Sequence, residues 1–134
     1  MTYHQEDEER EEDEEREEDE EREERITMEI IVDSYGPEEQ ALGWFCYLEG
    51  KMHFPFTARC VAQRTISPLE PGEEVEVVGM APDEECYHEM FVIIKWKSRT
   101  LGVPLIQLKG VDVDEETQQA MEDWEYWVDR GYEF

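Results

Sequence analysis

The chain is 134 residues long, and its 38 acidic residues against 12 basic ones give a formal net charge of −26. A charge of this size repels phosphate backbones and anionic lipid headgroups, which argues against binding to nucleic acids or membranes. The length fits a single domain, and the charge favours cations, basic proteins or simple solubility.

The first 25 residues form an acidic segment of low complexity that contains 16 acidic residues and four Arg. Arg10, Arg16 and Arg22 recur every six residues, each four residues after a Glu, which is the favourable order for ion pairs on a helix. Because acids outnumber Arg four to one, repulsion predicts a solvated, disordered tail with transient helix. We therefore expect a tail at 1–25 and a single folded domain at 26–134.

Two helices are predicted next. Apolar residues between Ile26 and Val32 indicate a short helix, which Ser34 to Pro37 interrupts. The second helix begins with Pro37, because the missing N–H of proline costs nothing at a first helical position. Its apolar residues recur at helical spacing as far as Leu48.

The period then changes to that of half-buried strands. Alternation predicts strands at 54–62 and 75–77, an apolar run predicts a central strand at 90–96, and Pro104 places a strand at 101–105 on an edge. Asp112 and Glu115 have the spacing of a helix start, and a final helix is expected to follow, with Trp124 and Trp127 on its buried stripe and Asp123 on its polar face. The order predicts an α+β fold: a small curled antiparallel β-sheet (partial barrel) of four to five strands, two N-terminal helices and a C-terminal helix.

Enzyme signatures are scarce in this sequence. It contains no Gly-rich phosphate loop, no nucleophile elbow and no zinc-protease helix, so we expect no catalysis. The three cysteines have no C-x-x-C spacing, which disfavours a zinc site or a disulfide framework. The sequence has no apolar stretch of transmembrane length, and we expect a reduced, cytoplasmic protein. We also expect a monomer.

Clustered carboxylates are the remaining chemical feature, and carboxylate oxygens are the ligands that Ca²⁺ prefers. The strongest cluster lies in a predicted loop, where turns free backbone carbonyls as well as side chains; an acidic loop kept for solubility is the alternative. At the Asp112 cluster the alternative is stabilisation of acids by the helix dipole. The four clusters are Glu38–Glu39; Glu70, Glu73, Glu74 and Glu76; Asp83, Glu84, Glu85 and Glu89; and Asp112, Asp114, Glu115 and Glu116.

An EF-hand is not expected at the last cluster. Asp112, Asp114 and Glu116 would fill its first, third and fifth positions, and Asp123 its twelfth. The sixth position is Thr117, where the sharp turn of an EF-hand requires Gly. Any calcium site must therefore have another geometry.

Several segments in order resemble the cyanobacterial calcium-binding protein family of the CcbP type. They are Leu42 to Glu49 (LGWFCYLE), Phe54 to Phe56 (FPF), Glu74 to Ala81 (EVEVVGMA), Ile93 to Trp96, Val103 to Leu105 and Trp124 to Trp127. The resemblance implies a cytosolic protein that binds Ca²⁺ without EF-hands and acts as a buffer or sequestering regulator. In cyanobacteria this family is tied to the calcium signal for heterocyst differentiation. The acidic tail looks like an addition to the family pattern.

Two functions from different classes follow. The first is a non-catalytic calcium-binding protein that holds one or two ions. Its expected ligands are Asp83, Glu84, Glu85 and Glu89, joined by Glu49 or by Asp112 and Asp114. The alternative is an acidic interaction protein that binds or inhibits a basic partner. Selectivity between Ca²⁺ and Mg²⁺, and the identity of any protein partner, stay open at this point.

Overall fold

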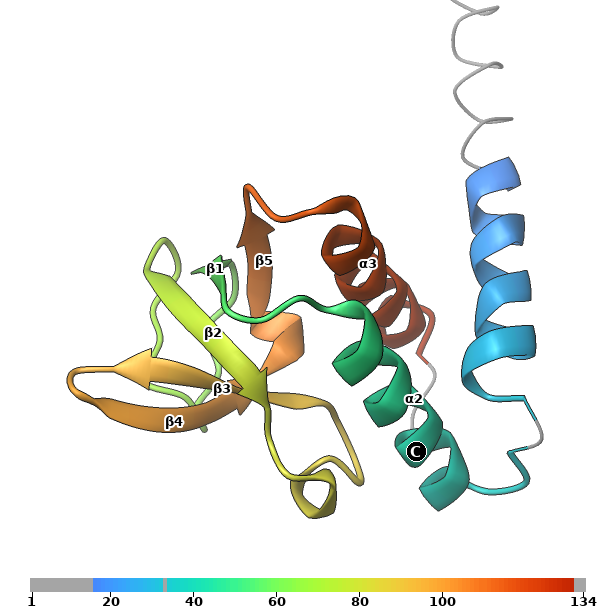
Figure 1. Cartoon of the computed structure of the whole chain (residues 1–134), viewed down its shortest axis with the longest axis horizontal. Coiled ribbons are helices and arrows are strands. Elements are labelled where there is room, and N and C mark those ends of the chain that lie inside the picture. The colour runs from blue at the N-terminus through green and yellow to red at the C-terminus, as the bar shows by residue number, and fades with distance from the viewer. Residues whose placement is uncertain (1–15, 33, 132–134) are drawn as a thin grey trace, which may run out of the picture.

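The computed structural model describes residues 16–32 and 34–131. Its architecture is α+β, as predicted, with helices packed beside an antiparallel sheet (Figure 1). After the helical residues 16–25, the elements in chain order are the π-helix η1 (Ile26–Ile30), α2 (Pro37–Lys51), β1 (Phe56–Cys60), β2 (Glu74–Met80), the 3₁₀ turn η2 (Asp83–Glu85), β3 (Phe91–Trp96), β4 (Arg99–Pro104), the 3₁₀ turn η3 (Leu105–Gln107), β5 (Leu108–Val111) and α3 (Glu115–Asp129).

The five strands form an antiparallel sheet in the order β4-β3-β2-β1-β5. Within the described chain the sheet is open, so β4 and β5 are its edges, and Pro104 ends an edge strand as predicted. In β1 the buried Phe56, Ala58 and Cys60 alternate with exposed residues, which follows from the two-residue period of a strand. β3 lies between β2 and β4, in keeping with its apolar character.

α2 and α3 pack on one another beside the sheet (Figure 1). Their contact is aromatic: the ring of Trp44 lies 5.2 Å from that of Trp124 and 5.5 Å from that of Trp127, in edge and tilted geometries. Such arrangements are favoured by the quadrupoles of the rings. All three tryptophans are buried, so this cluster is the centre of the helical layer.

A helix precedes α2, and the structure has it where the sequence predicts disorder, over residues 16–25. It continues into η1, whose Ile26 and Ile30 are buried. Gly43 of α2 allows a close approach here, since a Cβ atom on it would overlap the carbonyl oxygen of Ile30. Residues 1–15 of the predicted tail lie outside the described residues, and the division at residue 25 stays a prediction.

Asp123 explains why this acidic helix is attached. Its carboxylate is fully buried and accepts hydrogen bonds from Arg22 Nε (2.9 Å), from Arg25 Nε and Nη2 (2.9 and 2.6 Å), and from the Tyr47 hydroxyl (2.7 Å). The hydrogen bond to Asp123 raises the pKa of Arg25. Burial, followed by the bond to Asp123, raises the pKa of Tyr47. The prediction that Asp123 belongs to the polar face of the last helix, opposite the buried stripe, is therefore wrong, since its side chain is fully buried. A carboxylate buried to this extent needs such partners to offset the loss of water.

Two further contacts hold the same helix against α3. The Tyr126 hydroxyl donates to Glu23 Oε1 at 2.8 Å, and Arg130 Nη2 lies 3.4 Å from Asp19 Oδ2. α3 itself is one continuous helix that begins at Glu115, so no EF-hand loop exists between Asp112 and Asp123. Its N-cap is Asp114, whose side chain accepts the Thr117 N–H.

Candidate metal centre

The loop with the strongest predicted cluster is a 3₁₀ turn fixed by its own backbone. The Glu85 N–H donates to the Pro82 carbonyl at 2.9 Å, and the Cys86 N–H donates to the Asp83 carbonyl at 3.0 Å. Cys86 anchors the turn, because its buried sulfur accepts the Phe91 N–H at 3.4 Å. Burial raises the pKa of this thiol. The carboxylates of Asp83, Glu84 and Glu85 are consequently presented to solvent on a fixed turn.

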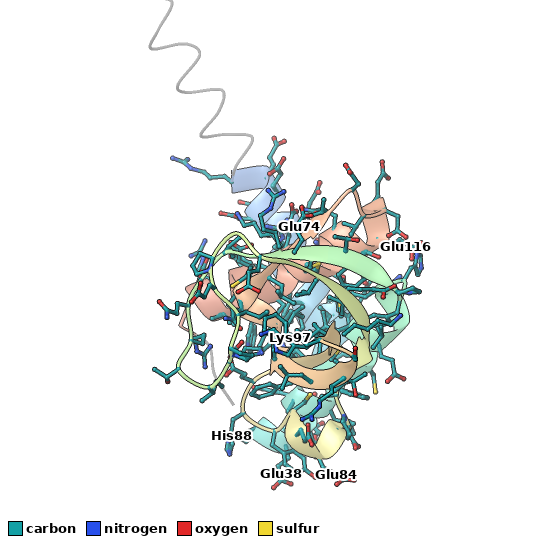
Figure 2. The ribbon with its side chains drawn as sticks, turned by 90° about the vertical axis from the view of Figure 1, so that its left-hand side faces the viewer. Glu38, Glu74, Glu84, His88, Lys97 and Glu116 are labelled. Carbon is teal, nitrogen blue, oxygen red and sulfur yellow. The ribbon has the colours of Figure 1, made fainter. Side chains whose placement is uncertain are left out.

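The first turn of α2 faces this loop. Glu38, Glu39 and Asp83 line one cleft of about 260 Å³, together with Ala41, Leu42, Phe45 and Tyr87. A larger hollow of about 540 Å³ shares Glu38, Glu39 and Tyr87 with it, so the two form one continuous surface. We call it the α2–η2 cleft. Figure 2 shows Glu38 and Glu84 projecting from the same end of the molecule.

The carboxylates at this cleft differ in whether they already accept a hydrogen bond. Glu39 Oε2 accepts the Tyr35 N–H at 2.9 Å, which fixes the entry to α2. Within residues 16–32 and 34–131, no hydrogen bond or ion pair engages the side-chain carboxylates of Glu38, Asp83 or Glu84. Those three side chains can therefore turn towards a cation without breaking another contact.

Two residues of the predicted set lie away from the cleft, and a third is directed at the sheet. Glu89 forms a two-pronged ion pair with Arg64, at 2.8 and 3.1 Å, and that hydrogen bonding raises the pKa of Arg64. Glu49 lies exposed near the other end of α2, about 16 Å along the helix from Glu38 at the usual rise per residue. Glu85 Oε2 approaches Gly102 of β4, at 3.9 Å from where a Cβ would stand.

Asp112 and Asp114 belong to a different hollow, of about 590 Å³, which His53 and Thr117 also line. Asp114 accepts the Thr117 N–H at 2.7 Å and also contacts His53 Nδ1. These interactions, the Thr117 hydrogen bonds first, lower the pKa of Asp114 to about 2. His53 Nε2 lies 3.4 Å from Glu116 Oε2, and Figure 2 shows Glu116 far from Glu38 and Glu84.

The described side chains that could ligate a metal do not form a preorganised site. Over the part of the chain that the structure describes, no three His, Cys, Asp or Glu side chains meet closely enough to hold a metal ion. The seven predicted ligands are distributed over several places, and their role stays a prediction. Glu38 and Glu39 form one of the predicted acidic clusters but are not among the predicted ligands. Their only signal was acidity at a helix start, and the chain fold brings them to Asp83.

The family model for calcium-binding proteins of the CcbP type matches residues 24–128. The chain belongs to the CcbP family. This CcbP-family protein is also similar to the crystal structure of Anabaena CcbP: the two are 40% identical with a TM-score of 0.77, over 86% of this chain and 94% of the other.

A second solved structure, a calcium binding protein in the calcium-binding form, is likewise 40% identical. Its TM-score is 0.76, and the match covers 84% of this chain and 93% of that one. No curated protein matches this chain. The family resemblance inferred from the sequence is thus confirmed. Among the described residues, no helix combines the length and apolar character needed to cross a bilayer.

Proposed function

We propose that this CcbP-family protein binds Ca²⁺ without catalysing a reaction and serves as a cytoplasmic buffer or sequestering regulator. The observation that supports this most is the family match over residues 24–128, in a chain 40% identical to a protein solved in its calcium-binding form. Cys46, Cys60 and Cys86 are free thiols, which suits a reducing compartment.

The proposed site is the α2–η2 cleft. Glu38 and Glu39 come from one segment and Asp83 from another, and Glu84 adjoins Asp83 on the turn. Ca²⁺ takes six to eight oxygens in flexible geometry, so these carboxylates with water and backbone carbonyls can supply its shell. Without an ion, mutual repulsion keeps the carboxylates apart. A divalent cation reverses that balance and draws the two segments together.

The hollow at Asp112 and Asp114 is the weaker candidate. Asp114 caps α3 and contacts His53, so binding an ion there would release contacts that already stabilise the helix start. At the cleft, by contrast, Glu38, Asp83 and the adjoining Glu84 give up only water. We expect a dissociation constant of roughly 10⁻⁷–10⁻⁵ M, the range of calcium sensors.

Isothermal titration calorimetry with Ca²⁺ tests both the function and the site. The double variant Glu38→Gln/Asp83→Asn should bind Ca²⁺ at least about tenfold more weakly than the wild type, because two charged oxygen donors are lost. Asp112→Asn is the matched control, since Asp112 is exposed and acidic but lies outside the cleft, and should change the affinity less than about threefold. A wild-type protein with no binding heat at millimolar Ca²⁺ contradicts the proposed function. Equal weakening by the control contradicts only the site.

Thermal unfolding gives an independent measurement. An ion that binds only the folded chain, present at about 100 times its dissociation constant, adds about 2.7 kcal/mol to the free energy of unfolding. The melting temperature should therefore rise with Ca²⁺ and fall back when a chelator is added. A melting temperature unchanged by Ca²⁺ contradicts binding to the folded state, and the same titration with Mg²⁺ measures selectivity.

A further inference from the structure

Apolar side chains are exposed around the α2–η2 cleft. Leu42 and Tyr87, which line it, are each 52% exposed, and Tyr35, which directly precedes the lining residue Gly36, is 89% exposed. Phe45 adds a partly buried aromatic ring to the lining. Aromatic and aliphatic side chains held on rigid elements are the anchors on which protein interfaces depend. Here Leu42 and Phe45 lie on α2, and Tyr87 lies in the bend that directly follows η2.

The charged groups around these apolar side chains are acidic. Among the described residues, Glu38, Glu39 and Asp83 line the cleft together with His88, and neither a Lys nor an Arg does. The whole chain, at a net charge of −26, extends the same field into solvent. Such a field steers positively charged partners towards the cleft and repels negative ones.

We infer that the α2–η2 cleft docks a basic amphipathic segment of a partner protein. Apolar side chains of the segment would cover Leu42, Phe45 and Tyr87, and its Lys or Arg residues would pair with the surrounding carboxylates. Together the two hollows, of about 540 and 260 Å³, are of the size of ordinary ligand pockets. The arrangement matches the helix-in-groove mode of peptide recognition.

Charge decides against the other occupants. Residues 1–15 hold nine acidic residues and one Arg, so the chain's own N-terminal segment is repelled from the cleft. A second copy brings another −26 and is repelled in the same way. Nucleic acid is excluded by the same sign of charge.

One consequence rests on the proposed function. If Glu38, Glu39 and Asp83 hold Ca²⁺, the ion and the basic segment compete for the same oxygens. Binding free energies are reciprocal, so Ca²⁺ weakens partner binding by the factor by which the partner weakens Ca²⁺ binding. The protein would then release its partner when the Ca²⁺ concentration rises, and so act as a calcium-dependent regulator as well as a buffer.

The test uses the full chain and a synthetic amphipathic helical peptide of Leu, Trp and Lys, labelled for fluorescence anisotropy. In chelator, Leu42→Ala/Tyr87→Ala should weaken peptide binding at least about tenfold, because it removes the apolar anchors and leaves every charge in place. Ile66→Ala is the matched control: Ile66 is 60% exposed but lies outside the cleft, and its loss should leave binding within about twofold. Both variants should melt like the wild type.

Two results would overturn the docking inference. The first is wild-type affinity in Leu42→Ala/Tyr87→Ala, which would mean attraction by charge alone. The second is equal affinity for a peptide of the same composition shuffled to remove its amphipathic face.

The effect of Ca²⁺ on peptide binding is measured separately. Millimolar Ca²⁺ should weaken peptide binding at least about fivefold, within the usual range of coupling between sites. If the apolar variant loses binding while Ca²⁺ has no effect, the docking inference is supported and the cleft is overturned as the ion site.

Discussion

Replacing Asp123 by Asn should detach the N-terminal helix from α3 and destabilise the whole domain. Removing one partner of a buried ion pair costs about 3–5 kcal/mol, because the remaining charge is left buried. Here the side chains of Arg22 and Arg25 are still 20% and 19% exposed, so water can compensate them in part. We therefore expect a loss of about 3 kcal/mol in the free energy of unfolding, near the lower end of that range. For a chain of this length, this corresponds to a fall of about 12 °C in melting temperature.

Circular dichroism during heating and urea unfolding measure this loss. Asp129→Asn is the matched control, because Asp129 is an exposed acid on the same helix, and neither an ion pair nor a hydrogen bond engages its side chain among the described residues. The control should remain within about 0.5 kcal/mol of the wild type. Trypsin should also cut after Arg22 and Arg25 faster in Asp123→Asn, since the helix that contains them is released. A loss below about 1 kcal/mol would refute the reasoning that Asp123 secures this helix.

Two further predictions concern stability. Gly43→Ala should lower the free energy of unfolding by about 1–3 kcal/mol, because the added Cβ would overlap the backbone of Ile30. Gly50→Ala, in the same helix, has open space around the added Cβ and should raise the free energy of unfolding by up to about 1 kcal/mol. A gain in both variants would contradict the close approach of α2 and η1. Asp114→Asn should be less stable than the wild type above about pH 4, and urea unfolding should show the difference closing as the pH falls towards 2, because the folded-state pKa of Asp114, about 2, lies below its usual 3.8. A difference that stays constant over that range would mean that the charge of Asp114 is not involved.

The strands were predictable because their pattern is local. Alternation along Phe56 to Cys60 and the proline at the end of β4 identify a half-buried strand and an edge without any knowledge of their neighbours. The turn between β3 and β4 is less accessible to such reasoning. Lys97 and Ser98 both have positive φ, with no glycine to signal the turn, so the strand predicted at 101–105 begins two residues late.

The sites that depend on distant partners were not predictable from local pattern. In the sequence, Asp123 is one of several acids on the polar face of a helix. It can be buried only because Arg22 and Arg25, about 100 residues earlier in the chain, donate hydrogen bonds to it in the fold. In the same way, Glu38 reads as a residue favoured by a helix start, and its proximity to Asp83 is created by the fold. Sequence thus indicates which groups are available, whereas tertiary contacts decide which of them meet.

The tryptophan cluster makes the protein its own optical probe. Trp44 of α2 lies against Trp124 and Trp127 of α3, and all three rings are shielded from water. Indole emission depends on the polarity and packing around the ring, so it reports any change in how α2 sits on α3. Because α2 begins at the acidic cleft, a ligand that pulls on its first turn acts on the helix that holds Trp44. Intrinsic fluorescence can therefore follow binding at the cleft in the unlabelled chain.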